Sequence, residues 1–171
     1  MYNEKDAAVR EANRQIVQRY FQLEHNSEEL FSLYAPDCQW EQPFFRPGVI
    51  SPIFPDGEGD FPKLPEGFEP PEFTPEWHWD DNTQIWGTDD PNFFFAANTG
   101  HGMQLNAKNE LRPYSNRYFH TFRFRDGKIV FYQEITNPLN LMDSMGVPHE
   151  PFPQPEDTMK ALIDIYEQQK K

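Results

Sequence analysis

Hydrophobic residues at helical spacing predict helices at the start and towards the end of the chain. They recur on one side of a helix through residues 4–26, with arginine, glutamate and glutamine between them. Ser27 is a typical N-cap, and the acidic residues after it predict a second, short helix over Glu28–Tyr34. Two further helices are predicted over residues 138–145 and 156–171.

Between these helices the pattern changes to that of strands. Several segments are rich in aromatic and β-branched residues and are separated by turn residues. The predicted strands cover residues 38–42, 77–86, 93–105, 116–125 and 128–136. Helices followed by a run of strands predict an α+β fold, in which the helices pack on one face of a curved antiparallel sheet.

Residues 43–75 fit neither pattern. They hold nine of the 17 prolines, which exclude a regular helix and a central strand. Large apolar side chains are spread through the segment, so we expect it to be ordered, either as a long surface insertion or as a lid over a pocket. The chain is therefore divided into a domain over residues 1–147, which includes this insertion, and an extension over 148–171 with the terminal helix.

The composition narrows the class of protein. The chain has 171 residues and a formal net charge of −13, which argues against a nucleic-acid partner, because a phosphate backbone requires a basic surface. The single cysteine, Cys38, excludes an internal disulfide. The first residues lack the pattern of a signal peptide, and no apolar run approaches the length of a membrane span. We therefore expect a cytoplasmic protein that does not bind membranes.

The aromatic content of 16% is high for so acidic a chain. High polarity alone would indicate disorder, but disordered chains are poor in aromatic residues. The two properties together predict a small chamber lined by aromatic side chains inside an acidic shell.

The hairpin over residues 116–136 is informative because its turn decides which side chains share a face. A two-residue turn at Asp126–Gly127 would place Glu134 opposite Phe119. A three-residue turn with a bulge at Gly127 would place Glu134 opposite Tyr118 instead. We favour the three-residue turn, because it groups aromatic and titratable side chains on one face, namely Tyr118, His120, Phe122, Phe124, Val130, Tyr132 and Glu134.

On this face His120 and Glu134 are predicted to be diagonal neighbours that reach a shared ligand. Burial among aromatic rings raises the pKa of a carboxyl group, which poises Glu134 for proton transfer near neutral pH. The alternative is a solvated glutamate at a strand end and a histidine that is hydrogen-bonded in the core. The opposite face carries apolar residues and arginines, among them Arg117, and suits a dimer interface.

The other histidines and the tryptophans add less chemistry. Glycines on both sides of His101 predict a bend at which another segment comes close. His101, His120 and Glu134 lack the spacing of a preformed metal site, so we expect no metal. Trp40 and Trp77 are the tryptophans that we expect to line the chamber.

Five segments of the strand region stand out by their order and spacing, namely Pro75–Trp79, Asp90–Phe95, Gly100–Gly102, Asn116–Phe122 and Gln133–Pro138. Together they resemble the phenazine-biosynthesis A/B proteins, which belong to the SnoaL-like branch of the nuclear transport factor 2-like superfamily. The resemblance implies a cone-shaped α+β barrel, with N-terminal helices packed on a curved antiparallel or mixed sheet. It also implies a ligand pocket between sheet and helices, a homodimer joined through the sheets, and no cofactor.

In that family an acid/base pair assists the condensation of two cyclohexane amino-ketones, and the resemblance implies that Glu134 is the glutamate of the pair. The segment that matches the family's catalytic histidine falls within residues 43–75, which contain no histidine. His78, His101 or His120 could supply a substitute imidazole, and the register of the hairpin favours His120. The predicted site has Glu134 and His120 as catalytic residues, and its substrate-binding residues are Tyr118, Tyr132, Phe122, Arg117, Trp40 and Trp77.

The sequence thus favours a cofactor-free enzyme that condenses, cyclises or isomerises a small cyclic keto- or amino-carboxylate metabolite. Arg117 would stabilise an anionic substrate from the rim, while Tyr118 and Tyr132 would orient it. A second hypothesis is a ligand-binding dimer of the same fold that has lost the family's histidine. A third is an interaction protein whose acidic loop and terminal helix contact a partner.

Overall fold

The computed structural model describes residues 4–24, 27–43, 50–52, 76–106 and 108–147, together with Lys160 and Ile163. The predicted insertion over residues 43–75 and the predicted terminal helix over 156–171 lie largely outside these ranges. The order of the insertion and the division of the chain at residue 147 therefore stay predictions.

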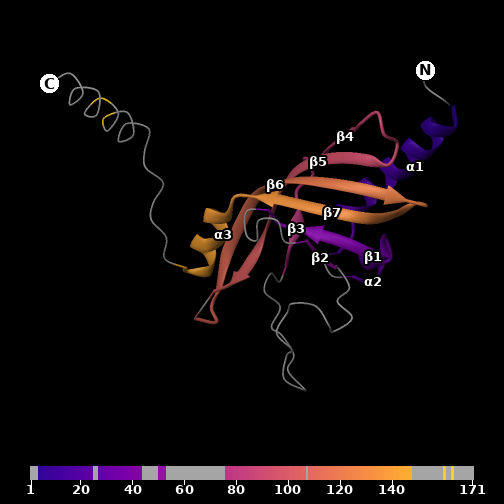
Figure 1. Ribbon diagram of the computed structural model, residues 1–171. Helices are drawn as coiled ribbons and strands as arrows, with labels where there is room; N and C mark the ends of the chain where they lie inside the picture. The colour runs from indigo at the N-terminus through magenta and orange to yellow at the C-terminus, as the bar shows by residue number, and fades with distance from the viewer. Residues whose placement is uncertain are drawn as a thin grey trace.

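A curved, open sheet of seven strands forms the body of the described chain (Figure 1). Its strands are β1 (Tyr34–Glu41), β2 (Ile50–Pro52), β3 (His78–Trp79), β4 (Gln84–Gly87), β5 (Phe93–Leu105), β6 (Leu111–Arg125) and β7 (Lys128–Thr136). They lie in the order β2-β1-β7-β6-β5-β3, and β4 also pairs with β5. Only β1 and β7 pair in parallel. The predicted α+β fold with a curved mixed sheet is confirmed, although the sheet does not close.

Three helices accompany this sheet, namely α1 (Glu4–Tyr20), α2 (Glu28–Phe31) and α3 (Pro138–Met145). Ser27 caps α2 as predicted, because its side chain accepts a hydrogen bond from the Leu30 amide (3.1 Å). The predicted helix over residues 28–34 is too long, since Tyr34 already begins β1. Within the described ranges, no helix has both the length and the apolar character needed to cross a membrane.

Polar side chains of α1 attach this helix to the sheet. The Asn13 side-chain amide donates a hydrogen bond to the Pro91 carbonyl oxygen in the turn between β4 and β5 (3.0 Å). This anchor sets the direction of α1, so that the end of the helix brings the Tyr20 and Phe21 rings against His120 of β6.

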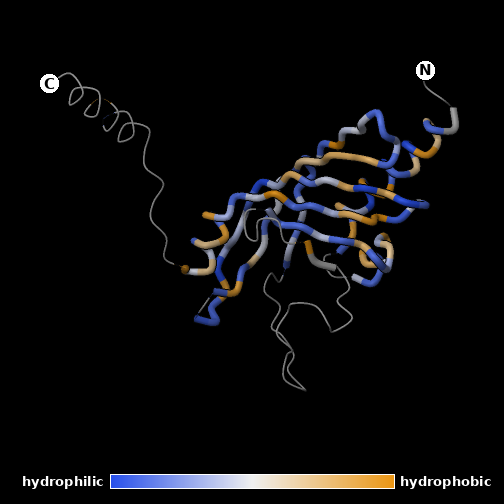
Figure 2. The backbone as a smooth tube through the Cα atoms, in the orientation of Figure 1, coloured by the Kyte–Doolittle hydropathy of each residue, from blue (hydrophilic) through white to orange (hydrophobic). Residues whose placement is uncertain are grey.

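Side chains along β5 and β6 alternate between the core and the solvent. Figure 2 shows that hydrophilic and hydrophobic residues both occur along each of these strands. On β6, Tyr118, His120 and Phe122 are buried, whereas Arg117 and Phe119 are exposed. The inward face and the ends of the helices form one hydrophobic cluster, whose buried members are Val17, Tyr20, Phe21, Leu30, Tyr34, Cys38, Phe94, Ala96, Phe122, Phe124, Ile129 and Tyr132. Burial of this face orders the sheet against α1 and α2.

The turn between β6 and β7 differs from the one that we favoured. Asp126 and Gly127 both have positive φ angles, 52° and 72°, and Arg125 pairs directly with Lys128. These are the features of a two-residue type I′ turn, in which glycine and aspartate tolerate the left-handed backbone. The predicted three-residue turn is therefore wrong.

A bulge then compensates for this turn. The register shifts after Arg123, and Val130 has no partner on β6. Beyond the bulge, Phe122 pairs with Tyr132 and His120 pairs with Glu134. The inward face predicted for these four residues is thus correct, but His120 and Glu134 are direct partners rather than diagonal neighbours.

Because of the bulge, the residues of β7 next to the turn are also placed differently from the prediction. Ile129, which we expected on the outer face, is fully buried and pairs with Phe124 in the core. Val130, which we expected on the inner face, is the residue left unpaired. The main-chain amide of Ile129 donates to the Leu33 carbonyl oxygen (3.0 Å), which ties the bulged segment to the start of β1.

The predicted close approach beside His101 is confirmed. A side chain at Gly100 would collide with the Trp77 ring and lie 2.9 Å from the Trp79 ring. A side chain at Gly102 would lie 2.9 Å from the Glu76 carbonyl oxygen. Because these two glycines have no side chains, the segment before β4 can lie close against β5.

We expect Gly100→Ala to lower the free energy of unfolding by about 1–3 kcal/mol, because the new methyl group displaces two packed indole rings. Gly87→Ala is the matched control on β4, since its Cβ would meet Arg10 and Phe94 at 3.4 Å, an ordinary contact distance. Urea titrations of both variants measure the difference. Equal destabilisation by the two substitutions would contradict this account of Gly100.

Candidate functional site

The predicted catalytic pair lies in the aromatic part of the inward face. Tyr118 and Phe122 stack on either side of His120 along β6, with ring centroids 5.8 and 6.1 Å from the imidazole. The Tyr132 ring of β7 stacks beside it at 5.8 Å, and the Phe21 ring covers it from the end of α1 at 5.0 Å. The Trp79 ring of β3 lies 5.3 Å from the imidazole as well, so rings from four elements enclose it.

His120 is fully buried, and both of its ring nitrogens have partners. Nδ1 lies 2.9 Å from the Tyr132 hydroxyl, and Nε2 lies 3.0 Å from Oδ1 of Asn98 on β5. Burial disfavours the charged imidazolium and lowers the pKa of His120 to about 3. The histidine is therefore neutral near pH 7, and neither nitrogen is left for direct contact with a ligand.

Glu134 of β7 adjoins the same cluster and is only partly buried. Its Oε2 is hydrogen-bonded to the Tyr132 hydroxyl (3.0 Å), and its Oε1 accepts a hydrogen bond from the Gln42 side-chain amide (2.7 Å). The surrounding protein raises the pKa of Glu134 by desolvation, although the bonds to Gln42 and Tyr132 act in the opposite direction. Glu134 thus combines partial exposure of the residue with a raised pKa of its carboxyl group.

Two further tyrosines complete the surroundings of Glu134. The rings of Tyr20 and Tyr34 pack beside Tyr132, with their centroids 5.4 and 6.4 Å from that of Tyr132. Burial is the largest cause that raises the pKa of all three tyrosines, and the charge of Glu134 raises them further. These hydroxyls remain protonated and act as neutral donors and acceptors around the carboxyl group.

A second buried network adjoins the first along β6. The Tyr114 and Tyr118 hydroxyls are 3.0 Å apart, and Asn116 donates to the Tyr114 hydroxyl (3.0 Å) and to the Asn137 carbonyl oxygen (2.8 Å). The Trp77 ring packs against Tyr114 and Tyr118. This network joins the sheet to the N-terminus of α3 and fixes the Tyr118 ring beside the site.

The other predicted substrate-binding residues are divided between two faces. Trp77 lies beside Tyr118 on the inward face, and Trp40 is partly buried, packs on the core cluster and pairs with Tyr132 across β1 and β7. Arg117 is exposed on the outward face, beside Phe119. Neighbouring strand residues point to opposite faces, so Arg117 lies away from the His120 cluster, and its predicted contact with a substrate from the rim stays a prediction.

Sequence reasoning missed the partners that come from other elements. Asn98 occupies an inward position of β5, and its polarity within an apolar strand was the available signal. Gln42 directly follows β1, and Tyr20 ends α1, where it is indistinguishable from a core residue by pattern. Among the described residues, no group of three or more histidine, cysteine, aspartate or glutamate side chains is arranged to hold a metal ion.

Residues 3–155 match the family model of phenazine biosynthesis protein A/B. The phenazine biosynthesis protein PhzB of Pseudomonas fluorescens is 26% identical over 147 residues, which cover 84% of this chain and 86% of that protein. PhzB1 of Pseudomonas aeruginosa is 36% identical over 74 residues, which cover 43% of this chain and 45% of PhzB1. In that second match the chain thus spans less than half the length of its relative.

Solved structures share the fold. A phenazine biosynthesis-related protein of Pseudomonas aeruginosa superposes with a TM-score of 0.67 at 20% identity, over 89% of this chain and 96% of that one. A SnoaL-like protein of Jannaschia sp. CCS1 superposes with a TM-score of 0.51 at 11% identity, over 81% of this chain and 94% of that one. These likenesses place the chain among SnoaL-like folds.

The raised pKa of Glu134 predicts how stability depends on pH. An unfolded glutamate loses its proton near its ordinary pKa of 4.5, whereas Glu134 in the folded protein keeps its proton to higher pH. The folded state then binds more protons across this window, so its stability falls as the pH rises through it. We expect Glu134→Gln to remove this decline, which amounts to at most about 1.4 kcal/mol per pH unit.

Urea midpoints across this pH range measure the effect. His120 contributes in the opposite sense, because its lowered pKa costs stability as the pH falls below the ordinary imidazole value, but it is present in both proteins. Glu41→Gln is the matched control, since Glu41 accepts a hydrogen bond from Gln133 (2.7 Å) on the same strand pair. A Glu134→Gln protein with the same pH slope as the wild type would show that Glu134 has no raised pKa.

Proposed function

Because this chain belongs to the phenazine biosynthesis protein A/B family, we propose that it is a cofactor-free acid/base enzyme. Its reaction is the condensation, cyclisation or isomerisation of a small cyclic keto- or amino-carboxylate metabolite. Glu134 is the residue that exchanges the proton, and the chemistry needs no group beyond those of the chain and its substrate.

The environment of Glu134 is the observation that carries this proposal. A general acid or base works best when its pKa lies near the working pH, and here desolvation moves the pKa of a carboxyl group in that direction. Gln42 and Tyr132 hold its two oxygens in fixed positions. A carboxyl group that is both oriented and partly accessible can meet a substrate without a large rearrangement.

The protonated carboxyl group donates its proton to a carbonyl oxygen or an imine nitrogen of the substrate. The resulting carboxylate accepts a proton from the carbon next to that group, or stabilises a cationic iminium-like intermediate. Tyr118, Trp77 and Trp40 supply apolar walls and His120 acts through Tyr132, because its own nitrogens are engaged. Phe122 is fully buried, and its ring stacks on the imidazole.

A ligand-binding protein without catalysis is the second candidate. Two observations favour it, namely the absence of histidine from residues 43–75 and the enclosure of His120. Such a protein would bind the same class of molecule on the same face. A measurement of turnover, rather than of binding affinity, distinguishes the acid/base enzyme from the ligand-binding protein.

Deuterium exchange of 3-oxocyclohexanecarboxylate in D₂O, followed by proton NMR, tests the acid/base function directly. We expect the wild type to accelerate exchange next to the carbonyl group, and Glu134→Gln to lower the rate by about 10²–10⁴-fold, because it can neither give nor take the proton. Glu41→Gln, on the same strand pair, should retain the wild-type rate. Undiminished exchange in Glu134→Gln would refute the role of Glu134, and saturable binding without exchange would favour the binding protein.

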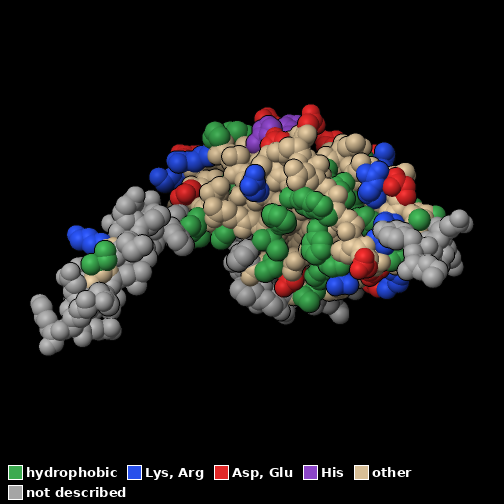
Figure 3. Space-filling view, turned by 90° about the horizontal axis from the view of Figure 1, so that it is seen from above, with side chains coloured by type: hydrophobic (Ala, Val, Ile, Leu, Met, Phe, Trp, Pro, Cys, Tyr) green, Lys and Arg blue, Asp and Glu red, His purple; other side chains and the backbone are tan. Residues whose placement is uncertain are grey.

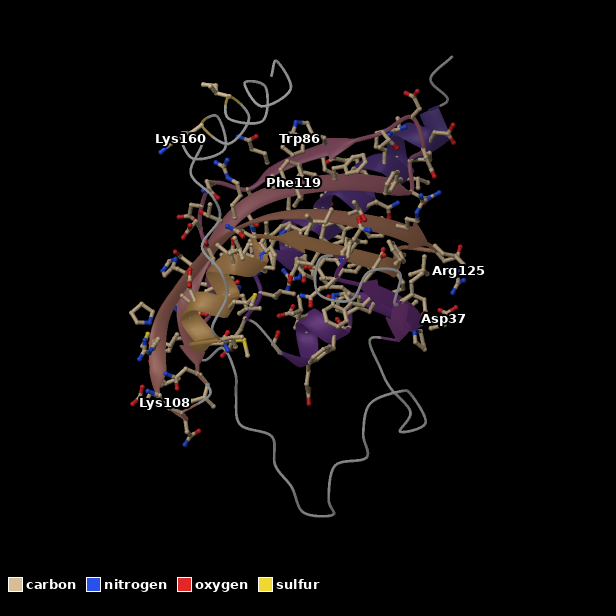
Figure 4. All side chains as sticks on the ribbon, turned by 60° about the vertical axis from the view of Figure 1, so that its left-hand side comes forward. Asp37, Trp86, Lys108, Phe119, Arg125 and Lys160 are labelled. Atoms are coloured by element: carbon tan, nitrogen blue, oxygen red, sulfur yellow. The ribbon has the colours of Figure 1, made fainter. Side chains whose placement is uncertain are left out.

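We also propose that the outward face of the sheet joins two copies of the chain. Large hydrophobic side chains are exposed there, with 44% of Trp86 and 49% of Phe119 accessible, and their rings stack with centroids 6.4 Å apart. Figure 3 shows hydrophobic side chains gathered on one face of the molecule, and Figure 4 shows Trp86 and Phe119 side by side. Arg123 lies over the Phe93 ring at 4.2 Å, and such arginine–aromatic combinations are enriched at interfaces.

Phe119→Glu places a charge at the centre of this patch and should weaken the dimer at least about tenfold, because burial of an unpaired carboxylate is unfavourable. Light scattering coupled to size-exclusion chromatography, run over a series of concentrations, measures the change. Phe31→Glu on α2 is the control, since Phe31 is similarly exposed (37%) but lies outside the patch. If both variants dimerise like the wild type, the interface is elsewhere.

A further inference from the structure

Four buried or half-buried side chains form an unbroken line across three strands. Asn98 Oδ1 lies 3.0 Å from His120 Nε2, His120 Nδ1 lies 2.9 Å from the Tyr132 hydroxyl, and that hydroxyl lies 3.0 Å from Glu134 Oε2. Each of the three contacts has room for one proton. The position of that proton in each contact follows from the donors and acceptors available.

Asn98 fixes the position of the first proton. Its Oδ1 can only accept a hydrogen bond, so the proton in the first contact belongs to His120 Nε2. A neutral imidazole carries one N–H, and His120 is fully buried, where the charged form is disfavoured. Nδ1 is therefore the acceptor in the second contact.

The remaining protons are then determined. The Tyr132 hydroxyl has a single proton, which it donates to Nδ1. With Tyr132 donating to Nδ1, the third contact holds a proton on Glu134 Oε2, which donates to the Tyr132 oxygen; when Glu134 is ionised, the Tyr132 hydroxyl donates to Oε2 instead. A protonated Glu134 also agrees with its partner on the other side, because its Oε1 then accepts from Gln42 as a carbonyl oxygen.

We propose that Glu134, Tyr132 and His120 form a proton relay, and that Asn98 sets its direction by holding a proton on Nε2 and leaving Nδ1 as the terminal acceptor. In one concerted step, the Glu134 O–H bond breaks as Tyr132 gains that proton, and Tyr132 passes its own proton to Nδ1. Glu134 becomes a carboxylate and His120 an imidazolium. No proton leaves the protein, and no group is oxidised or reduced.

The groups around the relay are consistent with this exchange. The titratable and polar groups that face it from α1, β1, β5, β6 and the segment after β1 are Tyr20, Tyr34, Asn98, Tyr118 and Gln42. All are neutral, so in the free protein nothing among them favours the charge-separated form. A cationic intermediate at the accessible end of the site would favour it, because the new carboxylate would then face a positive charge.

Asn98 is thus a positioning residue. Its side-chain Nδ2 is buried and makes no hydrogen bond within the described part of the chain, so the amide has no other structural partner than His120. The use of the relay in catalysis rests on the proposed acid/base function, whereas the existence of the relay does not. It can therefore be tested in the free protein, and failure of either proposal would be recognised separately.

Nitrogen-15 NMR of the histidine rings, with carbon-13 labelling of glutamate side chains, tests the relay on the full chain. We expect His120 to be neutral with its proton on Nε2 and Glu134 to be protonated. As the pH is raised, the Nδ1 resonance should move with the same midpoint as the Glu134 carboxyl resonance, because Tyr132 then turns its proton to the carboxylate. A proton on Nδ1, or an Nδ1 resonance that does not follow Glu134, would overturn the proposal.

Variants make the test specific. In Tyr132→Phe the two titrations should separate, while Tyr114→Phe, which removes a buried hydroxyl from the neighbouring network, should leave them coupled. Asn98→Leu should allow the proton to move to Nδ1, because no acceptor then holds it on Nε2. Coupling that persists in Tyr132→Phe would show that it passes through space rather than through the hydroxyl.

Discussion

The unpaired residue Val130 is the constraint on which the arrangement of the site depends. With the two-residue turn alone, every side chain of β7 would be shifted by one position against β6, and Glu134 would lie opposite Phe119 on the outward face. The bulge removes that shift, so that Glu134 meets His120. A hydrogen bond from the Ile129 amide to Leu33 holds the bulged segment against the start of β1, and this contact thereby supports the site from a distance.

The inward face that results is polar at its centre without being charged. A histidine, several tyrosines and two carboxamides lie among aromatic rings, and nearly every hydrogen-bonding atom of the first network has a partner. Unpaired buried polar atoms are costly, while satisfied networks fix one geometry. Glu134 and Gln42 are the partly exposed members of this network, whereas His120, Tyr132 and Asn98 are buried.

Much of the fold could be predicted, because local patterns report local structure. The bounds of β5, β7 and α3 agree with the predicted ranges, and the cap at Ser27 was visible as a residue type. The register of the hairpin was not predictable, because two turn types suited Asp126–Gly127. The bulge that sets the final register is stabilised by contacts with β1, which lies far away in the sequence. The partners of His120 and Glu134 escaped prediction for a similar reason: Asn98 and Gln42 are distant in sequence, and only the sheet order brings them together.

The four tryptophans of the chain divide between the two faces of the sheet, and this division has a spectroscopic consequence. Trp77 and Trp79 pack on the rings around His120, and Trp40 packs on the core cluster. Trp86 alone is strongly exposed and stacks on Phe119. Intrinsic fluorescence therefore contains two signals, because in the single chain Trp86 is more exposed to solvent than the inward indoles, which are partly buried among other rings. Removal of Trp86 would leave an emission spectrum that belongs to the interior alone.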